Sequence, residues 1–220
     1  MTPLEELRAR ALECRVCAIA ERRRNLVFGE GNPQAHLVLV GEGPGDKEDE
    51  TGRPFVGKAG QLLDRALQDN GLSREHVYIC NTVKCRACDW INGKPINRPP
   101  TDAEAMNCRR WLIPQLEMIA PKVILCIGAP SAKNLIKKDF RITVERGKYF
   151  PCEFAKTAMA TLHPAYILRQ QGPHSDGGYS LLVADIGRAW AAAQRLMEKD
   201  SQPLQKRSSE QKSLFSDSDF

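Results

Sequence analysis

Three short apolar runs separated by helical patterns constrain the fold of this 220-residue chain more than any other feature. They are residues 36–41 (HLVLVG), 77–81 (VYICN) and 122–128 (KVILCIG). Each contains β-branched residues and is too short for a core helix, which is typical of a strand buried on both faces. Strands that alternate with helices form a mostly parallel sheet covered on both sides, so we expect an α/β fold.

Helical patterns and turn signals fill the intervals between these runs. Capping boxes at Thr2 and at Thr101 predict helices that run toward Cys14 and Ile119. Three more helices are expected, over residues 58–70, 131–137 and 181–197. We predict an irregular loop over 85–100 and extended chain over 142–159. Functional side chains are expected at the carboxyl ends of the strands.

The amino-acid composition of the chain changes at its C-terminal end. From Asp200 onward Ser, Gln, Lys and Asp replace most apolar residues, so we expect one domain over 1–199 and a disordered tail over 200–220. Within this tail, Gln211, Leu214 and Phe215 match the QxxLF pattern by which bacterial proteins dock on the β sliding clamp. Chance is the alternative, because the pattern fixes only three positions.

Composition narrows the class of protein less than the motifs do. The net charge of +5 is compatible with nucleic-acid binding but does not establish it. No stretch reaches the roughly 20 apolar residues of a membrane span, and the N-terminus carries acidic residues where a signal peptide has an apolar segment. We expect a cytoplasmic monomer with no membrane partner.

The glycine-rich segment 41–64 follows a predicted strand and is expected to form a loop at the functional edge of the sheet. The stretch from Gly52 to Lys58 has the spacing of a phosphate-binding loop. However, Ala59 replaces the Ser or Thr that holds magnesium, and Pro54 lacks a backbone donor. Nucleotide binding is therefore not expected. Phe55 is either a stacking platform in this loop or an ordinary core residue.

Eight cysteines are many for a chain from a reducing compartment, where clustered cysteines favour metal over disulfides. Cys80 and Cys126 end apolar runs, and Cys152 lacks a neighbouring cysteine, so we expect all three to pack in the core. Five remain: Cys14, Cys17, Cys85, Cys88 and Cys108. Two CxxC pairs among them are compatible with a tetrahedral zinc site.

The segment from Gly41 to Asp64 resembles the first motif of family 4 uracil-DNA glycosylases, the iron–sulfur type of this DNA repair enzyme. Further matches follow in the same order: Asn81-Thr-Val-Lys-Cys85-Arg, Asn97-Arg-Pro-Pro and His163-Pro-Ala-Tyr-Ile-Leu-Arg169. The resemblance extends over residues 4–196. It implies a three-layer sandwich around a mostly parallel four-stranded sheet, and a monofunctional enzyme that hydrolyses the glycosidic bond of deoxyuridine in single- and double-stranded DNA.

The resemblance also assigns roles to single residues around a flipped base. Asn81 accepts from uracil N3–H and donates to O4, Phe55 stacks on the ring, and His163 binds O2, where negative charge develops. Gly43, which stands where other glycosylases carry a catalytic Asp, and Asn97 also line the substrate site. A lone Asn after a strand is more often a turn residue.

Two carboxylates, Glu42 and Glu48, are available to orient the attacking water, and Glu42 is preferred. Tyr166, Ile167 and Leu168, which follow His163, are expected to form a wedge that fills the space left by the flipped base. Arg169 is expected to contact DNA beside them. The alternative for them is packing of a loop onto the last helix.

The metal implied by the resemblance is a 4Fe–4S cluster held by Cys14, Cys17, Cys85 and Cys108, since the family's fourth ligand lies eleven positions after the asparagine that Asn97 matches. Cys88 is left over, and residues 86–95 look like an insertion. A nonenzymatic zinc-dependent nucleic-acid-binding module and a mismatch glycosylase for another base are the rival functions.

Overall fold

The computed structural model describes residues 1–201 of the chain. The clamp-binding pattern at Gln211, Leu214 and Phe215 therefore lies outside the described residues. Helix α9 (Tyr179–Ser201) is longer at both ends than the predicted helix over 181–197. Residues 200 and 201, which we predicted as the start of a disordered tail, belong to this helix.

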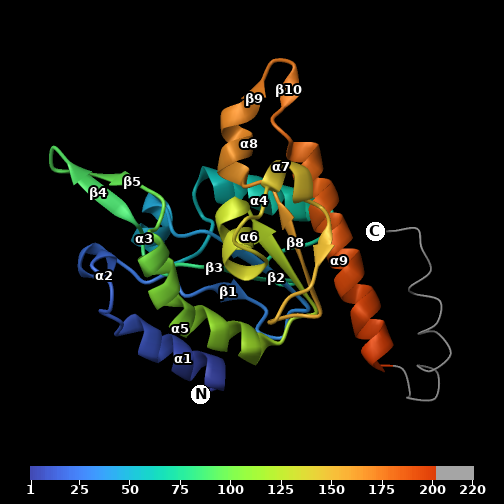
Figure 1. Ribbon diagram of the computed structural model, residues 1–220, viewed down its shortest axis with the longest axis horizontal. Helices are drawn as coiled ribbons and strands as arrows, with labels where there is room; N and C mark the ends of the chain where they lie inside the picture. Colours follow the sequence, from blue (N-terminus) through green and yellow to red (C-terminus); the bar gives the residue numbers. More distant parts are fainter. Residues whose placement is uncertain (202–220) are drawn as a thin grey trace.

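A mixed, mostly parallel sheet of six strands forms the centre of the fold (Figure 1). Its order is β1 (Glu30–Gly31), β3 (Tyr78–Asn81), β2 (Leu37–Gly41), β6 (Val123–Ile127), β8 (Thr157–Thr161) and β7 (Tyr149–Phe150). The four inner strands are parallel, which confirms the core of the prediction. The count of four was wrong, because a short antiparallel strand is added at each edge.

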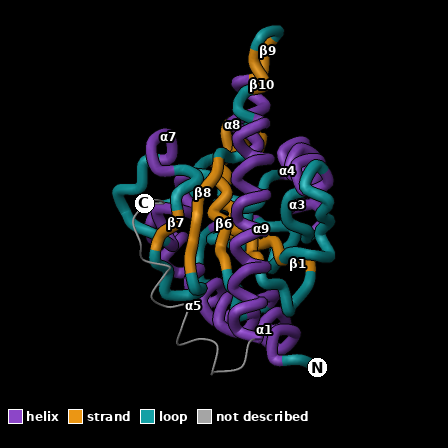
Figure 2. Tube along the Cα trace, turned by 90° about the vertical axis from the view of Figure 1, so that its right-hand side faces the viewer, coloured by secondary structure: helices purple, strands orange, loops and turns teal. Residues whose placement is uncertain are grey.

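Helices cover both faces of the sheet, as the buried strand sequences predict. On one face, Leu37 and Leu39 of β2 pack against α4 (Lys58–Gln68), α8 (Pro164–Gln170) and α9. On the other face, Val38 and Val40 pack against α5 (Asp102–Ile119) and α6 (Ala129–Leu135). Alternate residues of one strand thus enter different cores. Figure 2 shows α9 running along the strands of the sheet.

A third apolar cluster joins the N-terminal segment to α5. Helix α1 (Pro3–Leu12) begins at the predicted capping box of Thr2, and α2 (Ile19–Arg22) follows. Leu7, Ala11 and Ile19 pack there with Cys85 and Cys108. The cluster lies beside the central sheet and brings the N-terminal cysteines near those of the following loops.

Two segments differ from the sequence-based expectation. Residues 142–145, predicted as extended, form helix α7 (Ile142–Glu145), in which the Glu145 side chain accepts from the backbone N–H of Arg141 at 2.7 Å. Within the predicted irregular loop, β4 (Cys88–Ile91) and β5 (Lys94–Asn97) form a hairpin. Its turn residues Asn92 and Gly93 both have positive φ, the signature of a tight Asn-Gly turn.

Three small elements complete the described chain. Helix α3 (Asp46–Thr51) follows β2, and strands β9 (Gln171–Gly172) and β10 (Ser175–Asp176) form a second hairpin after α8. None of the helices within residues 1–201 has the length and apolar character needed to cross a membrane.

Candidate active site

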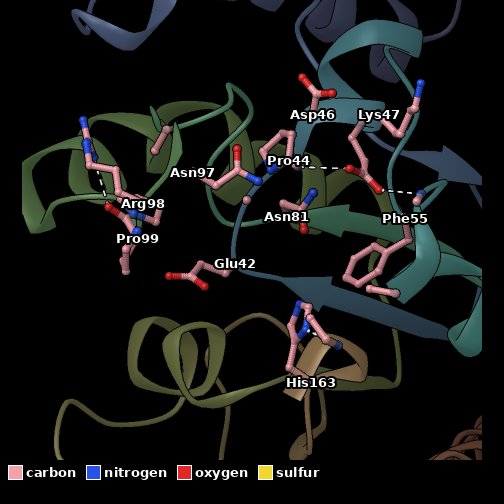
Figure 3. A pocket seen from close by; sticks show the side chains of 18 of the residues that line it. Glu42, Pro44, Asp46, Lys47, Phe55, Asn81, Asn97, Arg98, Pro99 and His163 are labelled. Carbon is pink, nitrogen blue, oxygen red and sulfur yellow. Dashed lines mark hydrogen bonds between the residues drawn. The ribbon is translucent and has the colours of Figure 1, made fainter. Parts of the chain in front are cut away.

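A pocket of about 720 Å³ opens at the carboxyl ends of β2 and β3. This volume is in the usual range for sites that bind a small molecule. The pocket brings together most of the predicted site residues from five separate parts of the chain (Figure 3). They are Glu42, Gly43, Glu48, Phe55, Asn81, Asn97, His163 and Arg169.

Asn81 is the last residue of β3, and its side chain is 1% exposed. Neither its Nδ2 nor its Oδ1 has a hydrogen-bond partner in the described structure. A buried amide left in this state costs free energy, so the unpaired atoms point to a ligand. Gly41 lies alongside, where a Cβ would come within 2.3 Å of Asn81 Oδ1 and 2.5 Å of the Phe55 ring.

Phe55 belongs both to the main core and to the pocket wall. Its ring lies 5.8 Å from that of His163, tilted by 31°. Its backbone has a φ of +52°, which costs free energy in a residue other than glycine. Arg74 compensates by donating to the carbonyls of Pro54, at 2.9 Å, and of Phe55 itself. Because Phe55 belongs to both the core and the pocket wall, its position is compatible with both alternatives, a stacking platform and a core residue.

His163 caps the N-terminus of α8, whereas the sequence predicted a loop there. Its Nδ1 accepts from the backbone N–H of Ala165 at 3.1 Å. A neutral ring in this arrangement carries its proton on Nε2, which makes Nε2–H a donor. Burial, followed by the nearby Arg169, lowers the pKa of His163 to about 4. The imidazole is therefore neutral at physiological pH.

The two predicted carboxylates have different surroundings. Glu48 accepts from three backbone N–H groups, those of Gly45 at 3.1 Å and of Val56 and Gly57 at 2.9 Å each. Glu42 makes no side-chain hydrogen bond to any residue within 1–201, and burial raises its pKa. In Figure 3 the Glu42 carboxylate stands apart from the other labelled side chains. Glu48, by contrast, braces the loop through its three backbone contacts.

Asn97 lies at the end of β5 and forms one rim of the pocket. Its Oδ1 accepts from Nε of the buried Arg86 at 2.6 Å, and Arg86 also pairs with Asp46. These contacts tie the first motif loop to the hairpin. They also fix the orientation of the Asn97 amide.

The residues of the predicted wedge differ in how deeply they are buried. Ile167 is fully buried in the main core, so the packing alternative describes it. Tyr166 and Leu168, on the same helix α8, are exposed. Arg169 lines the pocket.

A second groove continues from the pocket, with which it shares Glu42, Pro99 and Pro100. Its walls include four cations from α5, α6 and the following turn: Arg109, Lys133, Lys137 and Lys138. Lys137 pairs with Glu145 at 2.5 Å. Glu42, Asp102 and Glu153 line the same groove, so its cations exceed its carboxylates by one, which makes it a weakly basic surface for an anionic ligand.

A small cavity of mostly apolar lining lies between α2, α5 and the loop after β3, and the four predicted metal ligands Cys14, Cys17, Cys85 and Cys108 all line it. Cys88, on β4, does not. The four thiols are free, and burial raises the pKa of Cys85, with the neighbouring thiols Cys14 and Cys17 acting in the same direction. As the side chains stand, no three His, Cys, Asp or Glu within residues 1–201 are close enough to hold a metal ion.

A buried polar network that the sequence did not reveal lies between the pocket and this cavity. Lys84 is fully buried, and its Nζ donates to the Asn81 carbonyl at 2.9 Å and to Gln115 Oε1 at 2.5 Å. Its backbone N–H donates to Cys108 Sγ at 3.2 Å. A lysine in a loop sequence is normally expected to be exposed, so nothing near Lys84 predicts these contacts.

Comparison with known proteins gives a consistent result. The profile of the uracil DNA glycosylase superfamily matches residues 28–186. The type-4 uracil-DNA glycosylase of Thermotoga maritima is 43% identical over 187 residues, which cover 84% of this chain and 92% of that protein. The type-4 enzyme of Archaeoglobus fulgidus is 41% identical over 76% of this chain and 84% of its own. A type-5 uracil-DNA glycosylase of Pyrobaculum aerophilum is 31% identical over 49% of this chain and 50% of its own.

Proposed function

Since the chain belongs to the type-4 uracil-DNA glycosylases, hydrolases of N-glycosyl bonds that act in base excision repair, we propose a role for each group in its pocket. The observation that carries this proposal is the buried, unpaired amide of Asn81. The rival function as a nonenzymatic zinc-binding module does not account for that amide.

Asn81 reads the edge of the flipped base. Its Oδ1 accepts from uracil N3–H, and its Nδ2 donates to O4. Cytosine presents an acceptor at N3 and a donor at N4, so it would leave both amide atoms without a partner in a buried site. Phe55 supports this selection by holding the base plane against its ring, in the pocket that it shares with His163.

His163 stabilises the leaving group. Its Nε2–H donates to uracil O2, where negative charge grows as the base departs as an anion. The Ala165 N–H on Nδ1 keeps the ring in the required tautomer. Because the low pKa keeps this ring neutral, it acts as a hydrogen-bond donor and retains its proton.

Glu42 positions the attacking water. The water oxygen bonds to the sugar C1′ and its proton passes to the Glu42 carboxylate, while the bond between C1′ and uracil N1 breaks and its electron pair leaves with the base. Glu48 acts through the loop, because its oxygens already accept from Gly45, Val56 and Gly57. At Gly43 a Cβ would have its nearest neighbour at 3.6 Å, so this position leaves room beside the base.

The DNA strand follows the basic groove, with its phosphates near Lys133 and Lys138, and Arg169 faces a phosphate close to the flipped nucleotide. Tyr166 and Leu168 fill the vacated stack, and the buried Ile167 supports them from the core. Both single strands and duplexes fit this arrangement, because the base must leave the stack in either case.

A 4Fe–4S cluster fits the cysteine cavity in its donor set. Cys14, Cys17, Cys85 and Cys108 supply four thiolates from three segments, as such a cluster requires. When bound, the cluster provides a structural link, joining the N-terminal segment to α5 and to the loop after Asn81. Cys108→Ala is expected to lose most bound iron and Cys88→Ala to keep it; iron analysis that gave the opposite pattern would contradict this ligand set.

The C-terminal pattern supports a further partner. We infer that Gln211, Leu214 and Phe215 bind the β sliding clamp, since two adjacent apolar side chains supply roughly 3–6 kcal/mol before ordering costs. A peptide of the last ten residues and its Leu214→Ala, Phe215→Ala version are titrated against purified clamp. Equal binding by both peptides, or none by either, would contradict the inference.

The activity is tested on oligonucleotides with one uracil, opposite guanine or in a single strand. We expect uracil release followed by strand breakage only after alkali or heat, since a water and not an amine attacks C1′. Breakage without alkali would contradict the monofunctional mechanism. A matched oligonucleotide with thymine or hypoxanthine in place of uracil separates this function from that of a mismatch glycosylase.

A further inference from the structure

The β4–β5 hairpin exposes an unusual amount of apolar surface. Trp90, Ile91 and Ile96 are 48%, 52% and 49% exposed. Figure 1 shows the hairpin standing away from the body of the molecule, on the side of α2 and α3. A group of large apolar side chains that stays exposed on a small element marks a contact surface.

The hairpin is built to hold these side chains in place. The Asn92–Gly93 turn fixes the register, which pairs Trp90 with Pro95 and Ile91 with Lys94. Alternation along the strands places Trp90 and Pro95 on one face and Ile91 and Ile96 on the other.

The base of the hairpin is braced as well. Arg98, directly after β5, donates to Asp89 at 3.1 Å and to both oxygens of Glu104 on α5, at 2.7 and 2.8 Å. Asn97 is held by Arg86. The hairpin is therefore a positioned arm whose orientation relative to the pocket is set by these contacts.

The position and charge of the arm indicate its ligand. Ala87, Asn97 and Arg98, at its two ends, line the pocket described above, so the surface of the arm is continuous with the site of base excision. The guanidinium of Arg22 lies 5.8 Å from the centre of the Trp90 ring, and Lys94 is exposed at the turn. Exposed aromatic rings interleaved with cations are typical of surfaces that stack nucleic-acid bases.

We propose that the β4–β5 hairpin is a DNA-binding arm in which Trp90 stacks on a nucleotide beyond the immediate neighbours of the flipped uridine and Lys94, at the tip of the arm, contacts the phosphate backbone. This inference rests on the proposed function, since DNA is the ligand proposed for the adjoining pocket. It gives residues 86–95, which the mechanism does not use, a role in holding the substrate.

The test compares Trp90→Ala with wild type on a uracil-containing 20-mer and on a trinucleotide with uridine at its centre. A four-residue strand spans about 13 Å, so the short substrate does not reach the end of the arm. On the 20-mer we expect KM to rise about 5- to 150-fold, the effect of losing one stacked base, with kcat unchanged. On the trinucleotide both constants should be unchanged, and Trp90→Phe should restore most of the affinity for the 20-mer.

Val144→Ala is the matched control, because Val144 is 54% exposed and lies on α7, away from the arm. Lys94→Ala should make the slope of log affinity against log salt shallower by about 0.7 to 0.9, as for one lost phosphate contact. Equal KM values for Trp90→Ala and Val144→Ala on the 20-mer would overturn the proposal and leave the arm to a protein partner. An equal loss on the trinucleotide would also overturn it. Absence of uracil release by the wild type would instead refute the proposed function itself.

Discussion

Two buried amides, Asn81 and Gln115, lie on either side of Lys84 and differ in one respect. Both polar atoms of the Gln115 side chain are hydrogen-bonded. Its Nε2 donates to the Phe28 carbonyl at 3.0 Å and to the Tyr78 hydroxyl at 3.1 Å, and its Oε1 accepts from Lys84. Asn81 has none on its side chain. A protein gains stability from the first arrangement and loses it with the second. The difference separates a region that holds the fold together from a region kept ready for a ligand.

Lys84 connects the two regions. Its Nζ donates to the backbone carbonyl of Asn81 and to the side chain of Gln115. The position of the unpaired amide is thus set by the network whose own groups are paired. Substitutions on the two sides of Lys84 should therefore affect different quantities.

Gln115→Ala is expected to have the largest effect, and on stability. It leaves the buried Lys84 Nζ without its side-chain partner, which costs about 3 kcal/mol or more of unfolding free energy. Urea unfolding followed by circular dichroism measures this loss. Gln61→Ala, on the exposed face of α4, is the control and should stay within about 0.5 kcal/mol of wild type. Equal stability of the two variants would show that the network is not the stabilising region.

The double variant Lys84→Met, Gln115→Leu sharpens the same point. Removing the charge together with its partner takes away the unpaired ammonium, whereas the carbonyls of Phe28 and Asn81 still lose their donors. We expect the double variant to recover part of the stability that Gln115→Ala loses. A further fall in unfolding free energy would mean that the contact from Lys84 to the Asn81 carbonyl carries the stability instead.

The sequence predicts the pocket residues of this comparison, but it does not predict the residues of the polar network. The alternation of strands and helices gave the sheet, and motif order brought Asn81, Phe55 and His163 to one edge of it. The contact between Lys84 and Gln115 was not predicted, because two residues 31 positions apart in the chain leave no local sequence pattern. The hairpin was missed although Asn92–Gly93 is a turn signal, since its flanking residues do not alternate cleanly between polar and apolar. Ile167 was misjudged because its exposure depends on how α8 meets the core.

Asn81→Ala is the opposite of Gln115→Ala and should affect activity. Losing the contacts to the base edge is expected to lower kcat/KM about 5- to 150-fold, equivalent to about 1–3 kcal/mol. Its unfolding free energy should be unchanged or higher, since the amide bonds nothing within the described structure. Single-turnover excision and urea unfolding of the same sample provide both values. Stability that fell as far as in Gln115→Ala would remove the distinction between the two amides.

Asn81→Asp tests what the free amide reads. In its protonated form the carboxyl donates to cytosine N3 and accepts from N4, so this variant should release some cytosine while it excises uracil more slowly. Measurement of both bases from oligonucleotides that differ at one position gives the ratio. A variant that excised uracil as fast as wild type would show that Asn81 does not read the base.

The expected effect that is smallest at neutral pH is a pH dependence of stability that originates on the pocket side. His163 has a folded pKa of about 4 and an ordinary value of 6.5 when unfolded. Between these pH values the unfolded chain binds a proton that the folded chain does not, so stability rises with pH across this window and is fully present above it. His163→Asn should flatten this part of the curve. We assign the fall of activity at low pH to protonation of Glu42, because burial raises the pKa of this carboxyl. If the residual activity of Glu42→Gln falls at low pH as the wild-type activity does, another group causes that fall. Burial favours the neutral form of both Glu42 and His163, so the pocket that leaves the Asn81 amide unpaired also sets their behaviour at low pH.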